Sequence, residues 1–251
     1  MGKTIAVVNQ KGGVGKTTTA VNLTAALTEL GLKVLLIDFD PQANATSGFG
    51  VDKRAAKHSV YDVLINNVPA VEAIVSTKYG DVLPSSPNLA GAAVELLNTE
   101  GREHQLKNTI STIVDGYDLI FIDCPPSLEM LTLNSLAAAD SILVPVQCEY
   151  YALEGLADLM NTLRMVKKRI NPKLDIFAVA LTMFDGRTNF STQVAQEVRR
   201  HFPGKVFATV IPRNVRLSEA PSHGLPVTEY DKSSKGAQAY RAMALEIKEK
   251  L

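Results

Sequence analysis

Nine consecutive residues near the start of the chain have the composition of a loop that binds phosphate. Residues 10–18 read Gln-Lys-Gly-Gly-Val-Gly-Lys-Thr-Thr, between an apolar run over 4–9 and a helical pattern over 17–30. Glycines allow backbone N–H groups to converge on phosphate oxygens, and the amino end of the following helix adds partial positive charge. We therefore expect Lys16 to reach the β- and γ-phosphates of a nucleotide, and the Thr17 hydroxyl to be a ligand of Mg²⁺.

The loop departs from the GxxxxGK[ST] pattern at one position and carries one additional cation. Gln10 stands where the first glycine of the pattern belongs, and Lys11 is a second lysine beside Lys16. A loop that binds one nucleotide rarely needs two lysines. Lys11 therefore either has a further role at the phosphates or is an ordinary surface lysine. The residues expected to bind the nucleotide here are Lys11, Gly12, Gly13, Val14, Gly15, Lys16, Thr17 and Thr18.

Carboxylates follow two of the expected strands. The run over 33–38 ends in Asp38 and leads to Asp40, and the run over 118–123 ends in Asp123. Beside a phosphate loop, a carboxylate at the end of a strand can hold the hydration shell of Mg²⁺ or orient a water for in-line attack. We expect Asp123 to serve the magnesium and Asp40 the attacking water, whereas Asp38 is equally well explained as a strand-end cap.

Apolar, β-branched runs alternate with helix-length amphipathic stretches along the chain. Almost continuously apolar strands are typical of a parallel sheet buried on both faces, so the alternation predicts a doubly wound α/β fold with a mostly parallel sheet flanked by helices. Together with the loop over 10–18, this fold is expected to be P-loop NTPase-like. No linker or repeat interrupts residues 1–251, and we expect a single domain. The least regular stretch, 48–79, is expected to form an inserted helical patch beside the site. The expected strands are 4–9, 33–38, 81–85, 118–123, 141–146, 176–183 and 206–211, and the expected helices are 17–30, 103–114, 131–138, 152–169, 190–201 and 236–249.

Composition excludes several classes of protein. Among 251 residues, 46% are hydrophobic and 21% are charged, which excludes disorder, and a net charge of +0 excludes a uniformly basic coat. Two cysteines, Cys124 and Cys148, have no metal-ligand spacing, which favours a reducing cytoplasm without zinc. The longest apolar runs are shorter than a membrane span, so we expect neither export nor a membrane partner.

The charges are unevenly divided between the two parts of the chain. Residues 1–150 hold 10 basic and 16 acidic side chains, and residues 151–251 hold 16 basic and 10 acidic ones. An anionic partner should therefore meet the second part, and without a base-reading motif it would be contacted at its phosphates only. The alternative for each basic side chain is that it simply lies on the solvated surface and contacts no partner. The DNA-binding candidates are Arg187, Arg216, Lys232 and Lys235.

Pro212 and Asn214 follow the run over 206–211 and offer a base-binding surface. Proline supplies a flat apolar face, and the asparagine amide can pair with the edge of adenine. Loops at the carboxyl ends of strands are where a doubly wound sheet binds its ligands. We therefore expect the adenine of ATP to lie against these two residues.

Five segments together resemble the ParA family of chromosome and plasmid partitioning ATPases, in its short, Soj-like branch. The resemblance implies a deviant Walker A ATPase in which two subunits enclose ATP and Mg²⁺ as a homodimer, and Lys11 of each reaches the phosphates held by the other. The implied catalytic residues are Lys11, Lys16 and Asp40. The segments span most of the chain and are KGGVGKTTT (11–19), IDFDPQANAT (37–46), FIDCPPS (121–127), PVQCEYYALEG (145–155) and IPRNVRLSEAPSHG (211–224).

The same resemblance implies two macromolecular partners. The ATP dimer would bind double-stranded DNA without sequence preference, and a ParB-type centromere-binding protein would stimulate hydrolysis and so release it. The family uses basic residues at the positions of Arg187 and Arg216 for DNA, which implies a cytoplasmic, nucleoid-associated protein. Tyr150 and Tyr151 are expected to pack at a strand-to-helix turn near the dimer face.

Two other functions share such a phosphate loop. A membrane-surface ATPase of the septum-positioning, MinD-like kind would end in a basic amphipathic helix that inserts into lipid. Residues 236–251 instead mix Glu246 and Glu249 with lysines and lack Trp and Phe, which favours a helix packed on its own domain. A metabolic or electron-transfer ATPase carrying a cysteine-bound cluster is disfavoured by two isolated cysteines.

Overall fold

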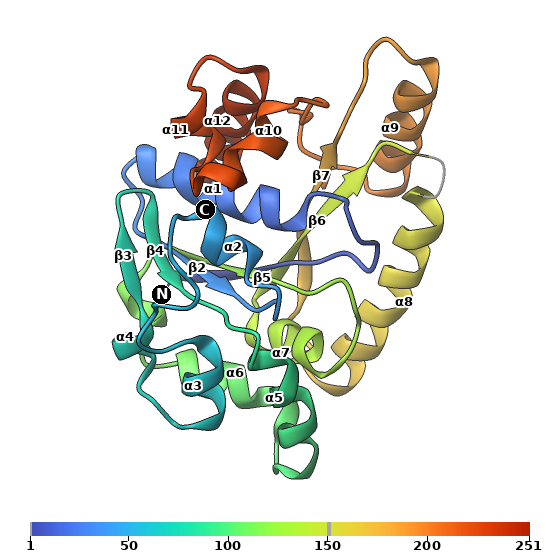
Figure 1. Cartoon of the computed structure of the whole chain (residues 1–251). Coiled ribbons are helices and arrows are strands. Elements are labelled where there is room, and N and C mark those ends of the chain that lie inside the picture. Colours follow the sequence, from blue (N-terminus) through green and yellow to red (C-terminus); the bar gives the residue numbers. More distant parts are fainter. Residues whose placement is uncertain (1, 150–151) are drawn as a thin grey trace.

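The computed structural model describes residues 2–149 and 152–251, and these form a seven-stranded sheet with helices on both faces (Figure 1). The strand order is β3-β4-β2-β5-β1-β6-β7, and all neighbours are parallel except β3 and β4. The predicted fold class is confirmed. The strands are β1 (Lys3–Val7), β2 (Val34–Asp38), β3 (Val75–Thr77), β4 (Gly80–Leu83), β5 (Leu119–Asp123), β6 (Ser141–Gln147) and β7 (Asp175–Thr182).

Helices of very different lengths connect the strands. The longest ones, α1, α8, α9 and α12, begin and end within two residues of the predicted bounds, whereas most of the short ones were not predicted. The helices are α1 (Lys16–Glu29), α2 (Asn44–Gly48), α3 (Val60–Ile65), α4 (Ala70–Ala73), α5 (Leu89–Glu95), α6 (Gln105–Ile110), α7 (Met130–Ala138), α8 (Ala152–Arg169), α9 (Asn189–His201), α10 (Arg216–Glu219), α11 (Val227–Tyr230) and α12 (Lys235–Lys248), with 3-10 turns η1 (Leu96–Asn98), η2 (Arg102–His104), η3 (Val114–Gly116) and η4 (Ala220–His223).

Each face of the sheet has its own apolar core. Along β1, Ile5 and Val7 pack into the core under α1, α2, α11 and α12, while Ala6, together with Val8 just after the strand, packs into the core under α3 to α9. Side chains of successive strand residues point to opposite faces, so a strand covered on both sides must be apolar throughout. This explains why continuous apolar runs predicted the strands.

The central strand β5 lies between β1 and β2 and brings three strand ends together. In the register of the sheet, Val7 of β1 and Asp38 of β2 both lie opposite Asp123 of β5. The loop after β1 therefore emerges beside the carboxylates that follow β2 and β5. This edge of the sheet is where the sequence predicted a ligand.

The predicted strand over 206–211 is wrong. This segment runs beside β7 and pairs with it only at isolated bridges, Val206 with Val179 and Pro212 with Phe184. Between these bridges, the N–H groups of Ala208 and Thr209 donate to the Glu246 carboxylate at 2.9 and 2.8 Å. A side chain of α12 thus takes the hydrogen bonds that a continuous ladder would need.

Two other expectations need correction. The predicted helix over 103–114 is broken into η2 and α6, followed by a separate turn, η3. Over 48–79 the chain does form short helices, α3 and α4, but it also forms β3, which pairs antiparallel with β4. The helices α3 and α4 pack on the core of one face rather than beside the candidate site.

The C-terminal helix packs on its own chain, as predicted. Ala237, Tyr240, Ala244 and Ile247 are buried against α1 and its neighbours, whereas Leu251 is half exposed. The Tyr240 hydroxyl lies 3.1 Å from Thr19 Oγ1, which joins α12 to the helix that follows the phosphate loop. The apolar face of α12 is thereby covered.

Gly224, which follows η4, makes a close backbone contact with the turn after α2. Its φ is +63°, and an added Cβ would lie 2.9 Å from Gly50 Cα. We expect Gly224→Ala to lower the free energy of unfolding by about 2–3 kcal/mol, from backbone strain together with overpacking. Gly101 has nearly the same φ, +62°, with nothing within 4 Å of its added Cβ. Gly101→Ala is the matched control and should lose only about 1 kcal/mol in urea unfolding; equal losses in both variants would contradict the packing argument.

Candidate functional site

The loop between β1 and α1 is shaped by contacts on both sides. Gly15 begins α1 with a φ of 89°, a conformation that strongly favours glycine. Thr182 Oγ1, from the end of β7, donates to the Val14 carbonyl at 2.8 Å. Asn9 holds the other side: its Oδ1 accepts from the Lys11 N–H at 3.0 Å, and its Nδ2 donates to the Pro145 carbonyl at 2.8 Å. The loop is therefore held from both sides, by the end of β7 and, through Asn9, by β6.

A cavity of about 370 Å³ lies over this loop at the amino end of α1. It combines loop glycines and hydroxyls with polar side chains that follow β2. Two of the predicted phosphate-loop residues do not line it: the Val14 side chain is buried in the protein, and Lys11 points elsewhere. The lining residues are Gly12, Gly13, Gly15, Lys16, Thr17, Thr18, Asp40, Gln42, Asn44, Pro126 and Met183.

Lys16 is the buried cation of the cavity. Its side chain reaches back over the loop, and Nζ donates to the Lys11 carbonyl at 3.2 Å. Burial lowers the pKa of Lys16, and the nearby Asp123 carboxylate opposes this shift. A buried ammonium with one neutral partner keeps two N–H donors for an anion.

Asp123 is the carboxylate at the end of β5. It is 0% exposed, and neither Oδ1 nor Oδ2 has a partner among the described residues. Burial, followed by repulsion from Asp38, raises the pKa of Asp123 well above its usual range, and the neighbouring Thr17 hydroxyl and Lys16 offset part of the shift. A buried acceptor with both oxygens unused, beside a threonine hydroxyl, fits a hydrated Mg²⁺.

Asp38 and Asp40 occupy different environments although they are two residues apart. Asp38 Oδ2 accepts from the backbone N–H and from Oγ1 of Thr46, both at 2.7 Å, which ties β2 to α2. Burial raises the pKa of Asp38 to about 6. Asp40 lines the cavity, and its Oδ1 accepts from the Gln42 N–H at 3.0 Å. Asp38 thus has the contacts of a structural cap, and Asp40 faces the space over the loop.

Lys11 points away from the cavity of its own chain. Its Nζ lies 3.8 Å from Glu149 Oε2, and its side chain is 36% exposed. Glu149 also contacts Gln147 and Arg213, so three side chains share one carboxylate. Tyr150 and Tyr151, expected to pack near this position, lie outside the described residues.

A second cavity of about 350 Å³ adjoins the first. Gly15, Thr18 and Met183 line both, so the two cavities lie side by side at the amino end of α1. The second cavity is mostly apolar and contains both predicted base-binding residues. Its remaining lining residues are Thr182, Ile211, Pro212, Arg213, Asn214, Val215, Leu217, Ser218 and Tyr240. A polar space at a helix terminus beside an apolar one fits the phosphates and the base of a nucleotide.

Sequence reasoning missed several lining residues. Met183 has a φ of 49°, follows β7 and lines both cavities. Tyr240 reaches from α12 into the second, mostly apolar cavity, which we call the base cavity. The position of Met183 at the carboxyl end of a predicted strand was a usable signal. Nothing local marks Tyr240, because the packing of α12 on α1 brings it there.

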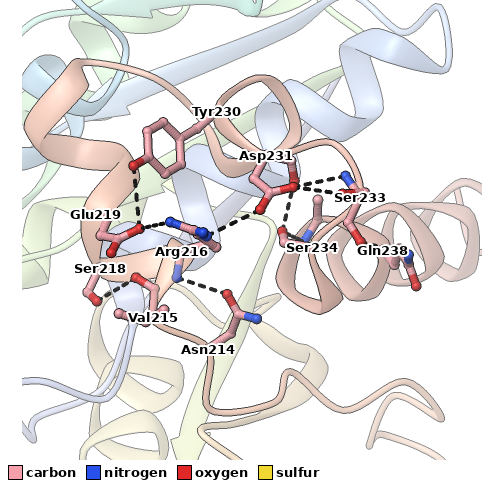
Figure 2. A network of polar contacts seen from close by, with 11 residues as sticks. Asn214, Val215, Arg216, Ser218, Glu219, Tyr230, Asp231, Ser233, Ser234 and Gln238 are labelled. Carbon is pink, nitrogen blue, oxygen red and sulfur yellow. Dashed lines mark hydrogen bonds and ion pairs between the residues drawn. The ribbon is translucent and has the colours of Figure 1, made fainter.

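The predicted DNA-contacting residues are divided between two places. Arg216, Lys232 and Lys235 lie around the start of α12, where Arg216 pairs with Asp231 next to Lys232 (Figure 2). Arg187 lies in the loop between β7 and α9, is 88% exposed and pairs with Asp185 at 2.7 Å. Lys78, from the turn between β3 and β4, pairs with Glu229 at 3.2 Å, and Lys232 pairs with the same carboxylate. Lys78 is therefore a further basic residue near Lys232, which the sequence did not indicate because it lies in the first part of the chain.

The two cysteines are buried thiols. Burial raises the pKa of Cys124 to about 12 and that of Cys148 to about 11. Thiolates are the reactive and metal-binding form, so neither side chain is prepared for such a role.

Comparison with known proteins identifies close relatives over the full length of the chain. Residues 2–176 match the family described as "AAA domain". The chain is 54% identical over 249 residues to the sporulation initiation inhibitor protein Soj of Bacillus subtilis, covering 98% of each chain. It is 49% identical over 249 residues to the chromosome partitioning protein ParA of Myxococcus xanthus, covering 98% of this chain and 88% of the relative.

Solved structures share the fold at high similarity. A structure named cobyrinic acid a,c-diamide synthase from Mycobacterium smegmatis, with bound ADP and magnesium, is 40% identical with a TM-score of 0.86, covering 98% of this chain and 94% of that one. The cell division ATPase MinD of Pyrococcus furiosus is 29% identical with a TM-score of 0.82, and the match covers 100% of both chains. Both relatives align along almost the whole sheet and its helices.

Proposed function

Because this chain belongs to the Soj/ParA family of chromosome-partitioning P-loop ATPases, we propose that it is an ATP-driven switch that segregates DNA. In this proposal residues 1–251 act as one ATPase domain in the cytoplasm, associated with the nucleoid. Binding of ATP and Mg²⁺ joins two subunits, the dimer binds duplex DNA without sequence preference, and a ParB-type protein stimulates hydrolysis and release. The polar cavity over the loop of residues 10–18, with an apolar cavity directly beside it, is the observation that carries the proposal.

Three polar side chains in or beside the first cavity have roles that follow from their positions. Lys16 binds the β- and γ-phosphates, and the loop N–H groups and α1 complement their charge. Thr17, which lines the cavity, and Asp123, which is buried outside its lining, would hold a hydrated Mg²⁺, which would neutralise charge on the triphosphate.

The adenine is held in the second cavity. Pro212 supplies an apolar surface to the ring, and the Asn214 amide pairs with its edge. Asn214 Oδ1 already accepts from the Arg216 N–H at 3.0 Å, so Nδ2 is the group left to donate to the base. This arrangement orients the nucleotide with its phosphates toward α1.

Lys11 acts on the nucleotide of the partner subunit. Its ammonium is turned toward Glu149 rather than toward its own cavity, and a half-exposed ion pair of this kind is weak enough to exchange. Phosphates brought by a second subunit would compete with Glu149 for this cation. ATP would therefore strengthen the dimer through a contact that only the dimer can make.

The membrane-surface alternative is disfavoured by the packing of α12. A membrane-inserting helix needs a free apolar face, but Ala237, Tyr240, Ala244 and Ile247 are already buried. In the parts of the chain that the structure describes, no helix has the length and apolarity to span a bilayer.

The proposal is tested by binding to an arbitrary duplex of a few hundred base pairs. We expect tight binding with a slowly hydrolysed ATP analogue and weak binding with ADP, equal on unrelated sequences and falling steeply with salt. Anionic liposomes are the parallel ligand. Lys11→Ala is the matched variant, because it should still bind the analogue but remain a monomer and lose the DNA. Binding to liposomes without binding to DNA would overturn the proposal in favour of a membrane-surface ATPase.

A further inference from the structure

Two carboxylates of the same chain hold the guanidinium of Arg216. Its Nη1 donates to Glu219 Oε2 at 2.7 Å, and its Nε lies 3.3 Å from Asp231 Oδ2 (Figure 2). The Arg216 side chain is 47% exposed, so a ligand can reach it from solvent. A phosphate that approaches this guanidinium competes with both carboxylates for its charge and is repelled by them.

Both carboxylates are themselves fixed in place. Tyr230 donates its hydroxyl to Glu219 at 3.4 Å, and its ring stacks on His223 with centroids 4.9 Å apart. Asp231 Oδ1 accepts from the N–H and Oγ of Ser233, at 3.2 and 3.0 Å, in the turn that leads into α12. The pair is a preorganised clamp rather than a chance contact of long side chains.

The turn that carries Arg216 also forms the wall of the base cavity. Asn214, Val215, Leu217 and Ser218 all line that cavity, on either side of Arg216. Leu217 packs so closely on the start of α12 that a Cβ at Gly236 would lie 2.9 Å from its Cγ. A base that displaces these lining residues must therefore move Arg216 relative to Asp231 and α12.

We propose that Glu219 and Asp231 form a clamp that withholds Arg216 from DNA until a nucleotide in the adjoining cavity shifts the turn over 214–219. The inference rests on the proposed function, since it concerns how the DNA-binding state is selected. Once Glu219 and Asp231 release Arg216, its guanidinium is free to contact DNA beside Lys232 and Lys235. Each subunit then makes one more contact to a DNA phosphate. The clamp lowers DNA affinity mainly in the state without ATP.

The test compares Glu219→Gln, Asp231→Asn and the double variant with the parent protein. With ADP, we expect the double variant to bind an arbitrary duplex about fivefold more tightly, with a plot of log affinity against log salt steeper by about 0.9 per subunit. With the ATP analogue, the DNA affinity of the double variant should change little. The ratio of DNA affinity with the analogue to DNA affinity with ADP should therefore fall. Adding Arg216→Ala should remove the gain, which general loosening of the fold would not predict.

Asp185→Asn is the matched control. It releases Arg187 from an equally close ion pair, and although Met183 at the start of the same loop lines the base cavity, neither Asp185 nor Arg187 does. We expect Asp185→Asn to raise DNA affinity by the same factor with ADP and with the ATP analogue, so that the ratio of the two affinities stays unchanged. If the clamp variants behave in that way too, or leave ADP-state binding unchanged while the parent binds DNA with the analogue, the clamp is wrong and the proposed function stands. If the parent binds no DNA in either state, the proposed function fails and the clamp fails with it.

Discussion

Replacing Lys16 with alanine is expected to abolish nucleotide binding. Lys16 is 7% exposed, and its ammonium donates to the Lys11 carbonyl and leaves two N–H groups for phosphate. Charge-assisted hydrogen bonds to a sheltered anion contribute about 3 kcal/mol, which corresponds to roughly a 100-fold loss of affinity. Titration with a fluorescent ATP analogue measures this loss directly.

Two control variants separate the charge of Lys16 from its packing. Lys16→Gln keeps a donor for the Lys11 carbonyl but removes the charge, so it should lose affinity nearly as much as alanine does. Lys11→Ala removes a lysine of the same loop and should retain binding within a few-fold, because Lys11 pairs with Glu149. Equal losses at both lysines would show that Lys11 also serves its own nucleotide. Unchanged affinity in Lys16→Ala would contradict the placing of phosphate in this cavity.

The sequence predicted the sheet where burial on both faces dictated composition. Strands β1, β2, β5 and β6 are continuous apolar runs because both faces are covered, and they formed where expected. The run over 206–211 has the same composition, but Glu246 from α12 takes the N–H groups of Ala208 and Thr209. Ala208 and Thr209 stand 38 and 37 positions before Glu246 in the sequence, so no local pattern could have indicated these two hydrogen bonds.

The site was predictable to the extent that strand ends and loop composition determine it. Asp40 and Asp123 were placed at this edge of the sheet by the alternation of strands and helices, and both lie there. Alternation alone left Asp38 undecided, because only the folded chain shows Thr46 of α2 against its carboxylate. The orientation of Lys11 toward Glu149 and the ion pairs of the basic residues depend on side-chain neighbours, which spacing does not reveal.

Replacing Asp40 with alanine is expected to stop hydrolysis while ATP binding persists. Asp40 is 9% exposed, lines the phosphate cavity, and has one carboxylate oxygen held by the Gln42 N–H. The other oxygen can accept a hydrogen bond from a water in line with the γ-phosphate. Groups that position or activate a nucleophile contribute about 100-fold or more to rate. Steady-state release of phosphate should therefore fall by at least that factor, and an ATP-bound dimer should accumulate on DNA.

The comparison of Asp40 with Asp38 distinguishes water positioning from simple maintenance of the loop. Asp40→Asn keeps the oxygen that accepts from Gln42, so the loop should persist while the rate stays low, because an amide is a poorer acceptor for the water. Asp38→Asn changes a carboxylate that contacts Thr46, and its main effect should appear in the free energy of unfolding rather than in the rate measured on folded protein. If Asp40→Ala hydrolyses ATP at the parent's rate, the water is oriented by another group, and Gln42 and Asn44, which line the same wall, become the residues to replace.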